Sequence, residues 1–489
     1  MKRIATAWAI VLLLAATSSV ALQKNEASQA PTAAESKAAP ADAPRAGARA
    51  GATWPSEAEI REILRGRIDV AKKGVGIVVG LIDDKGTRII SYGKVRHNGD
   101  ALVDGDSVFE IGSITKTFTG LLLSDMVEKG EVKLDDPISK YLPKTVKAHK
   151  VKGKEITLLN LTRHTSGLPR LPDNFAPKDP ANPYVDYTAK DLYAFLNKYK
   201  STREIGANYE YSNLGVGLLG HALERRAGKD YESVLRARVL QPLEMSNTAI
   251  TLTPFMKSHL AVGHWDRVPV ANWDFATLAG AGALRSTARD MLKYLAANLG
   301  LNKTALLPAM ERTHEAVEVS RYGGVEIGLG WGAKKYAGTE VVMHGGRTAG
   351  YRTYVGMDKK NRRGVVVLAN SDATDVETIG GHLLNNGYVL AKLSPPPPLK
   401  AMKLDTKLLD AYVGSYKLTP ESSVEFTRDG ERFFAKVPTA PKFEVFAESE
   451  AQFFAEDIDA AATLRKGDQG AVYLTLRLGD RFRQGKKDK

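Results

Sequence analysis

The chain of 489 residues is 43% hydrophobic and 26% charged, which excludes disordered, collagen-like and coiled-coil proteins and allows more than one domain. It has no cysteine, which excludes disulfides, thiolate metal sites, iron–sulfur clusters and a cysteine nucleophile. The net charge of +13 contains no run of five consecutive Lys or Arg, so it favours anionic surroundings but not a nucleic-acid-binding arm.

The first residues are typical of an export signal. Lys2 and Arg3 precede a mostly apolar run at 4–16, and small residues follow at 19–21, where a signal peptidase would cleave. The apolar run is short for a membrane span, and no stretch of 18 apolar residues occurs elsewhere. We therefore predict a signal peptide at 1–21 and a periplasmic or secreted bacterial protein without a stable membrane span after processing.

Residues 22–53 are rich in Ala and Pro, and Leu22 is their only large apolar residue. Such a segment buries too little apolar surface to offset the entropy of ordering it, so we predict a disordered linker. From Trp54 onward the pattern is that of a folded domain, beginning with helix-like spacing at 57–70.

A β-hairpin is predicted next. The apolar run at 76–82 and a second run at 87–91 flank the turn sequence Asp83-Asp84-Lys85-Gly86. Helical spacing follows at 113–129, and the chain to about residue 300 is largely helical with Pro- and Gly-rich connections.

Strand-like runs return towards the end of this domain. They lie at 326–334, 339–344, 351–357 and 364–369, and a helix is predicted at 374–392. The economical arrangement is one sheet built from both ends of a domain at 54–393, with a helical insertion between them.

The remaining residues predict a separate small domain. A proline-rich spacer at 394–401 is stiff, and residues 402–489 have the alternation of an all-β barrel or sandwich. Strand-like runs at 424–428 and 431–433 flank Asp429-Gly430, which predicts a hairpin.

The strongest chemical motif is Ser113-Ile114-Thr115-Lys116. A Ser and a Lys three residues apart share one helix face, so Lys116 can reach the Ser113 hydroxyl. A buried lysine that favours the neutral amine can activate a serine nucleophile. Alone, this pattern is common, and a capping serine beside a solvated lysine is its simpler interpretation.

Two later motifs change that balance. Tyr211-Ser212-Asn213 supplies a hydroxyl and an amide, and His344-Gly345-Gly346 ends an apolar run before a turn. The order Ser-x-x-Lys, hydroxyl/Asn element and strand motif is that of penicillin-recognising enzymes. Together the three motifs favour a catalytic site.

On these residues the chain resembles the penicillin-recognising serine hydrolases, in particular the class C β-lactamase group with its D-alanyl-D-alanine carboxypeptidase, D-aminopeptidase and esterase relatives. The likeness covers about residues 60–392, with LTRHTSGLP at 161–169 and GAGALRSTARDM at 280–291 as supporting stretches. It implies an α+β fold, with an antiparallel sheet flanked by helices and a helical region. The C-terminal residues 402–489, which we call the tail, resemble the lipocalin-like domain found in some of these hydrolases.

The resemblance also implies roles for individual residues. Ser113 would be the acylating nucleophile, Lys116 its proton acceptor and Tyr211 a second proton-transfer group. The implied substrate-binding residues are Asn213, His344, Gly345 and Gly346, and the backbone N–H groups of Ser113 and Arg347 would form the oxyanion hole. No cofactor and no metal is implied.

The chemistry needs these groups, because a serine hydroxyl must lose a proton as it attacks and the leaving amine must gain one. Two residues depart from the β-lactamase pattern, His344 in place of a Lys and Thr115 in place of a smaller residue. A neutral imidazole attracts a carboxylate less than an ammonium does, which counts against efficient hydrolysis of β-lactams.

Other motifs have simpler interpretations. The stretch Gly215 to Gly220 matches a dinucleotide-binding pattern but follows no apolar strand, so helix packing is favoured. His164, His221 and His314 lack partners at compact ligand spacing, so we interpret them as structural. No Gly-x-Ser-x-Gly occurs, which argues against an α/β-hydrolase.

The sequence therefore predicts a serine hydrolase acting on amide bonds of peptidoglycan-type D-Ala-D-Ala-like peptides or of β-lactams. Two alternatives stay open: a carboxyl esterase with the same Ser/Lys/Tyr site, and a non-hydrolytic penicillin-binding sensor. No nucleic-acid partner is expected, and motif spacing says nothing of oligomeric state.

Overall fold

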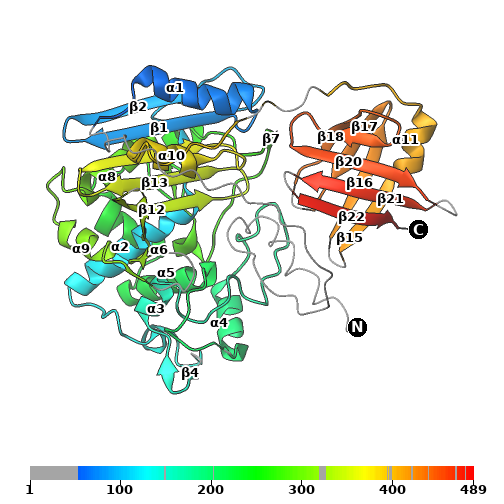
Figure 1. The fold of residues 1–489 in the computed structure, drawn as a ribbon. Coiled ribbons are helices and arrows are strands. Elements are labelled where there is room, and N and C mark those ends of the chain that lie inside the picture. Colours follow the sequence, from blue (N-terminus) through cyan, green and yellow to red (C-terminus); the bar gives the residue numbers. More distant parts are fainter. Residues whose placement is uncertain are drawn as a thin grey trace, which may run out of the picture.

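The computed structural model describes residues 53–147, 150–201, 203–318, 326–336, 338–393, 395, 399–419, 422–438, 440–467, 471–478 and 481–488. The predicted signal peptide at 1–21 and all but the last residue of the predicted linker at 22–53 lie outside these residues, as does part of the predicted spacer at 394–401. The described chain forms a main body, our name for residues 54–393, and a barrel beside it (Figure 1).

An eight-stranded antiparallel sheet crosses the main body. In spatial order its strands are β2 (Gly86–Gly93), β1 (Gly76–Asp83), β14 (Arg363–Ala369), β13 (Arg352–Asp358), β12 (Thr339–Arg347), β11 (Gly332–Tyr336), β10 (Glu326–Ile327) and β9 (Val317–Glu318). Strand β1 pairs with both β2 and β14. The predicted hairpin and the predicted meeting of both chain ends in one sheet are thus confirmed.

Helices cover both faces of this sheet, which explains why the central strands are apolar throughout. Ile77 and Val79 of β1 face the core under α1 (Glu57–Arg65) and α10 (Val376–Leu384), whereas Val78 faces the larger core that includes α8 (Ala288–Asn298). A strand with two buried faces gains from apolar side chains at every position.

The helical region between β2 and β9 lies against one face of the sheet (Figure 1). Its helices are α2 (Thr115–Glu128), α3 (Leu158–Thr162), α4 (Ala189–Lys198), α5 (Asn213–Ala227), α6 (Tyr231–Leu235), α7 (Pro254–Ser258), α8 and α9 (Leu307–Thr313). Short strand pairs connect them: β3 (Val108–Glu110) with β8 (Arg285–Thr287), β4 (Lys150–Val151) with β5 (Lys154–Glu155), and β6 (His264–Trp265) with β7 (Val268–Pro269).

The helical segment predicted at 57–70 is α1 followed by a π-helical turn over Gly66–Val70, so its bounds are confirmed. Two other predictions were wrong in their bounds. The helix predicted at 374–392 is only α10. The strand predicted at 326–334 is two strands, β10 and β11. The chain turns between them because Gly330 has φ +82 and lies directly against Lys116, where an added Cβ would be 2.3 Å from the lysine carbonyl oxygen.

The same turn packs on helix α2, which gives a stability prediction. A Cβ added to Gly120 would lie 2.0 Å from the Leu329 carbonyl oxygen. We expect Gly120→Ala to lower the free energy of unfolding by about 2 kcal/mol or more. This clash outweighs the helix propensity of alanine, which exceeds that of glycine by about 1 kcal/mol in an exposed helix. Urea unfolding of Gly120→Ala measures this.

Gly99→Ala is the matched control, because the nearest atom to its added Cβ is 3.4 Å away, an ordinary contact. A Gly120→Ala protein that is more stable than wild type would contradict the close approach of α2 to Leu329.

The tail forms a closed barrel in which each strand pairs with its chain neighbours. Its strands are β15 (Gly414–Thr419), β16 (Ser422–Asp429), β17 (Arg432–Lys436), β18 (Phe443–Ala447), β19 (Gln452–Phe454), β20 (Ala460–Lys466), β21 (Val472–Leu478) and β22 (Arg481–Lys487). The predicted hairpin is confirmed by the pairing of Asp429 with Arg432. The prediction of an all-β tail missed helix α11 (Thr406–Tyr412), whose Leu409 packs into the barrel core.

The pairing of β15 with β22 closes the barrel, and alternate side chains of each strand fill its core. Val472, Leu474 and Leu476 point into the core, while Tyr473 between them is exposed.

Among the helices that the structure describes, none is long and apolar enough to span a membrane.

Candidate active site

Ser113 lies where strand β3 leads into helix α2. The chain leaves β3 at Glu110, makes a 3₁₀ turn over Gly112–Ile114 and enters α2 at Thr115. Gly112 has φ +52, a conformation that favours glycine. The predicted helix start is thus a short 3₁₀ turn that leaves Ser113 partly exposed, although both of its neighbours are buried.

Lys116 is completely buried and its amine has three partners. Nζ lies 3.0 Å from Ser113 Oγ, 2.9 Å from Asn213 Oδ1 and 2.6 Å from the Ala281 carbonyl oxygen. Two of these oxygens can only accept, so they take the two protons of a neutral amine. The amine's lone pair then faces the Ser113 hydroxyl.

Burial favours the neutral form of both groups that contact the Ser113 hydroxyl, Lys116 and Tyr211. It holds the pKa of Lys116 well below the ordinary value of 10.5, and the charge of Arg170 lowers it further. Burial raises the pKa of Tyr211 to about 12, although its hydrogen bond to Ser113 opposes this shift. A neutral amine beside a neutral phenol makes Lys116 the better proton acceptor of the two.

Tyr211 donates its hydroxyl proton to Ser113 Oγ at 2.7 Å, so the serine oxygen lies between the lysine and the tyrosine. The Tyr211 ring packs against the ring of buried His164, with centroids 4.5 Å apart and the planes tilted by 32°. His164 Nδ1 accepts the backbone N–H of Ser212 at 3.1 Å, which ties it to the same motif. The sequence predicts a structural role for His164, and these two contacts specify that role: His164 orients Tyr211.

Asn213 begins helix α5, directly after Ser212, whose side chain caps the helix by accepting the N–H of Gly215 at 2.8 Å. Asn213 Oδ1 accepts from Lys116, and Nδ2 donates to the Tyr184 hydroxyl at 3.3 Å. The first two motifs therefore meet around the lysine amine.

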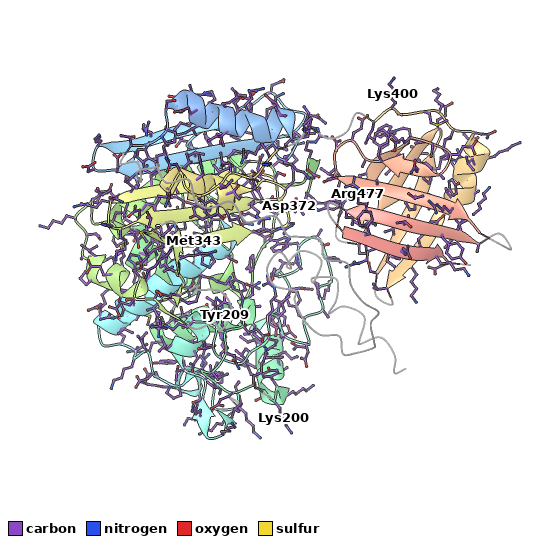
Figure 2. All side chains as sticks on the ribbon, in the orientation of Figure 1. Lys200, Tyr209, Met343, Asp372, Lys400 and Arg477 are labelled. Atoms are coloured by element: carbon purple, nitrogen blue, oxygen red, sulfur yellow. The ribbon has the colours of Figure 1, made fainter. Side chains whose placement is uncertain are left out.

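His344 comes from strand β12, whose neighbour Met343 is labelled in Figure 2 above Tyr209 of the Tyr211 loop. Its Nδ1 lies 2.6 Å from the Gly345 carbonyl oxygen. A carbonyl only accepts, so Nδ1 carries the proton and Nε2 is an acceptor. Burial lowers the pKa of His344 to about 4, so the ring is neutral at physiological pH.

Gly346 lies against the backbone that carries Ser113. A Cβ added there would lie 2.0 Å from the Ile111 carbonyl oxygen, and one added at Gly112 would lie 2.8 Å from Arg347 N. These contacts bring the Arg347 backbone beside the turn that holds Ser113. Gly345 faces the opposite side of the sheet, where an added Cβ would lie 3.4 Å from Glu377.

Arg170 is a residue of the site that sequence reasoning missed. Its side chain is exposed and its guanidinium carbon lies 5.2 Å from the Tyr211 ring centroid. The sequence feature that points to Arg170 is its position directly after the 161–169 stretch, which also supplies His164 to the site. The 280–291 stretch contributes Ala281, the carbonyl partner of Lys116.

The remaining sequence candidates lie in the helical region. Gly217 and Gly220 of α5 pack on Leu278 and Gly280, which confirms helix packing for the glycine pattern. His221 contacts Glu224, and His314 packs beside buried Trp331. The described part of the chain contains no cluster of three or more His, Asp or Glu side chains arranged for a metal ion.

The lysine pKa predicts the pH dependence of any hydrolysis at Ser113. The rate kcat/KM should fall as pH falls through the depressed pKa of Lys116, because protonation removes the acceptor for the serine proton. His344, with its pKa of about 4, should add no further inflection above about pH 5. A kcat/KM profile with a neutral ester measures this. An acidic limb near the ordinary lysine value would contradict it.

Comparison with known proteins locates this site in a known family. The family model described as Beta-lactamase matches residues 60–384. A protein of Escherichia coli strain K12, "D-alanyl-D-alanine-carboxypeptidase/endopeptidase AmpH", is 30% identical over 315 residues, which are 61% of this chain and 80% of the relative. A "Beta-lactamase" of the same organism is 28% identical over 309 residues, 55% of this chain and 77% of the relative.

A solved structure shares the fold of the main body. The crystal structure of "Beta-Lactamase/D-Alanine Carboxypeptidase from Pseudomonas syringae" superposes with a TM-score of 0.58 at 20% identity. It covers 67% of this chain and 97% of the other.

Proposed function

Because the chain belongs to the beta-lactamase family and is a serine hydrolase, we propose that it forms an acyl-enzyme on Ser113 and hydrolyses amide bonds of D-Ala-D-Ala-like peptides or β-lactams. One observation carries the proposal: Ser113 Oγ lies 3.0 Å from Lys116 Nζ and 2.7 Å from the Tyr211 hydroxyl. A serine between an amine acceptor and a phenol donor is arranged for acyl transfer.

In acylation, Ser113 Oγ bonds to the substrate carbonyl carbon while its proton passes to Lys116 Nζ. The carbon–nitrogen bond then breaks, and the proton returns to the leaving nitrogen with the Tyr211 hydroxyl as relay. In the second half, water attacks the ester carbonyl and gives its proton to the same pair. Ser113 Oγ leaves and recovers a proton from Lys116.

Negative charge develops on the carbonyl oxygen in both halves, and fixed N–H donors stabilise it. We propose the backbone N–H groups of Ser113 and Arg347 as these donors. The close packing of Gly112 on the Arg347 backbone supports the pairing. We also propose that Asn213, His344, Gly345 and Gly346 bind the rest of the substrate.

The neutral ring of His344 does not offer a charge to a substrate carboxylate, so we propose that Arg170 does. We expect Arg170→Gln to raise KM for an anionic D-Ala-D-Ala peptide by about 10-fold or more, the value of a charge-assisted hydrogen bond. KM for a neutral p-nitrophenyl ester should not change, which makes the ester the internal control. Equal effects on both substrates would contradict a role in charge recognition.

A substrate panel tests the proposed function against its alternatives. Purified protein is incubated with a D-Ala-D-Ala peptide, a chromogenic cephalosporin, a fluorescent penicillin and a short p-nitrophenyl ester. Release of D-alanine or opening of the cephalosporin supports the proposal. Ester turnover alone would favour a carboxyl esterase, and durable penicillin labelling without turnover would favour a sensor.

We also propose that the protein acts in the periplasm or outside a bacterial cell and that its barrel is lipocalin-like. The signal pattern at 1–21 and the chain-order closure of the barrel support these proposals. N-terminal sequencing of the mature protein tests the first, since retention of residues 1–21 would contradict cleavage.

A further inference from the structure

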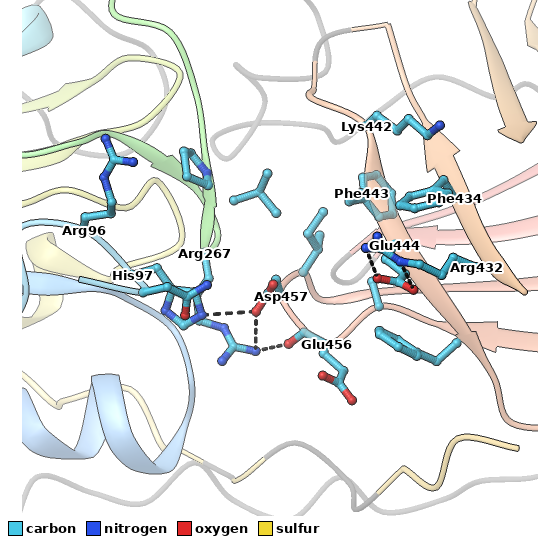
Figure 3. Close-up of a pocket in the computed structure, with 16 residues that line it drawn as sticks. Arg96, His97, Arg267, Arg432, Phe434, Lys442, Phe443, Glu444, Glu456 and Asp457 are labelled. Carbon is cyan, nitrogen blue, oxygen red and sulfur yellow. Dashed lines mark hydrogen bonds and ion pairs between the residues drawn. The ribbon is translucent and has the colours of Figure 1, made fainter. Parts of the chain in front are cut away.

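The hairpin of β6 and β7 joins the main body to the barrel through Arg267. The Arg267 backbone N–H donates to the Asp457 carbonyl oxygen at 3.1 Å, and its guanidinium lies 3.8 Å from the Asp457 carboxylate. The same carboxylate lies 3.2 Å from His97 Nε2, so two side chains of the main body contact it (Figure 3). A cavity of about 420 Å³ opens beside these contacts. The barrel is thus docked on the turn of this hairpin.

Asp266, the other residue of the turn, receives a second contact from the barrel. Its Oδ2 accepts the backbone N–H of Asp459 at 2.7 Å. The Asp459 carboxylate is held by Lys73 at 2.7 Å and by Arg477 of the barrel at 2.6 Å. Asp266 is only 8% exposed, so the docking contact is sheltered from water.

From Asp266 the contacts continue into the main body. Its backbone N–H donates to Asp372 Oδ1 at 2.8 Å, and its carbonyl oxygen accepts the Ser371 hydroxyl at 2.5 Å. Asp372 lies just after Asn370 and Ser371, which follow the end of β14 at Ala369, on the side of the main body next to the barrel (Figure 2). The turn is therefore fixed to the end of the central sheet.

The second oxygen of Asp372 contacts the candidate oxyanion site. Asp372 Oδ2 accepts from Arg347 Nη2 at 2.7 Å, and Asp372 is 7% exposed. One buried carboxylate thus joins the hairpin turn to the residue whose backbone packs on Gly112 beside Ser113. A buried charge with both oxygens occupied holds its partners in a defined geometry.

The hairpin also contacts the turn that follows Arg347. The His264 backbone N–H donates to the Gly350 carbonyl oxygen at 3.0 Å, and a Cβ added to Gly350 would lie 2.6 Å from Gly263. Arg347 is therefore restrained on both sides, through its side chain and through the turn after it.

We propose that Asp372 is a positioning residue for the oxyanion site and that the docked barrel, acting through the 266–267 turn, stabilises that position. The inference rests on the proposed function at Ser113. It assigns the barrel a share in catalysis without placing any barrel residue at the reacting atoms. Asp372 acts only through Arg347.

The main test is Asp372→Asn, which keeps the shape of the side chain but presents an amide to the Arg347 guanidinium. We expect kcat per titrated active site to fall about 10- to 100-fold, with KM nearly unchanged. The upper value is about the effect on kcat of losing one oxyanion-hole donor. The inhibition constant of an arylboronic acid, which forms a tetrahedral adduct on the serine, should rise by a similar factor. A merely structural role would lower the melting temperature and leave both values unchanged.

Asp375→Asn is the matched control. Asp375 lies three residues along the chain and pairs with Arg67 at 3.1 Å, so its variant removes a similar ion pair. It should change stability but neither kcat nor boronate affinity. An Asp372→Asn protein that behaves like this control would overturn the inference.

The barrel arm of the proposal is tested in the full chain with the double variant Arg267→Ala/Asp457→Asn. We expect a smaller fall in kcat, about 3- to 10-fold, and no further fall when it is combined with Asp372→Asn, because both act on one element. Effects that multiply would overturn the link to the barrel. A wild-type protein inactive on the whole panel would instead contradict the proposed function, and this inference with it.

Discussion

Ser113→Ala should lower kcat/KM by at least about 10⁴-fold and abolish labelling by a fluorescent penicillin, because it removes the oxygen that forms the acyl-enzyme. The fold should survive the change, since Ser113 is only partly buried and its hydroxyl lies between two side chains that are anchored elsewhere. Lys116 keeps its contacts with Asn213 and the Ala281 carbonyl oxygen. Steady-state kinetics and gel fluorescence measure the loss.

Ser124→Ala provides a control in α2, the helix that follows Ser113. Ser124 is completely buried, and its hydroxyl has no hydrogen-bond partner among the described residues. Its loss should leave both activity and labelling unchanged. Full activity in Ser113→Ala would show that the nucleophile has been assigned to the wrong residue.

Lys116→Met should lower kcat/KM by about 10²- to 10⁴-fold, the range for loss of a positioned general base. Methionine keeps the length of the side chain but has no lone pair of comparable basicity. The variant leaves Asn213 Oδ1 and the Ala281 carbonyl oxygen without their donor, a cost of about 1–3 kcal/mol each. Thermal melting separates that stability cost from the loss of rate.

Two further variants decide what the result means. Lys129→Met removes an exposed lysine directly after α2 that pairs with Asp125 at 2.7 Å, and it should leave the rate unchanged. Tyr211→Phe removes only the hydroxyl that contacts Ser113. If Tyr211→Phe costs more than Lys116→Met, the phenol rather than the amine is the main proton acceptor, contrary to the depressed lysine pKa.

Much of the fold could be predicted from the sequence because its signals are local. Alternation and turn residues predicted the hairpin of β1 and β2 and the hairpin of β16 and β17. The bounds failed where a distant segment sets them. Gly330, for example, interrupts the strand predicted at 326–334, because the chain turns there against the Lys116 backbone.

The candidate site shows the same division. Because residues three apart share a helix face, the sequence alone determined that Lys116 can reach Ser113. It also determined that any nucleophile here is not a thiol, since the chain has no cysteine.

Only the tertiary structure decided the state and the surroundings of these groups. Burial depresses the pKa of Lys116 and lowers that of His344 to about 4, and no local pattern encodes how much water reaches either side chain. The contact of Arg347 with Asp372 joins segments 25 residues apart. Such contacts depend on how the sheet, the hairpin and the barrel pack, which the spacing of residues along the chain does not specify.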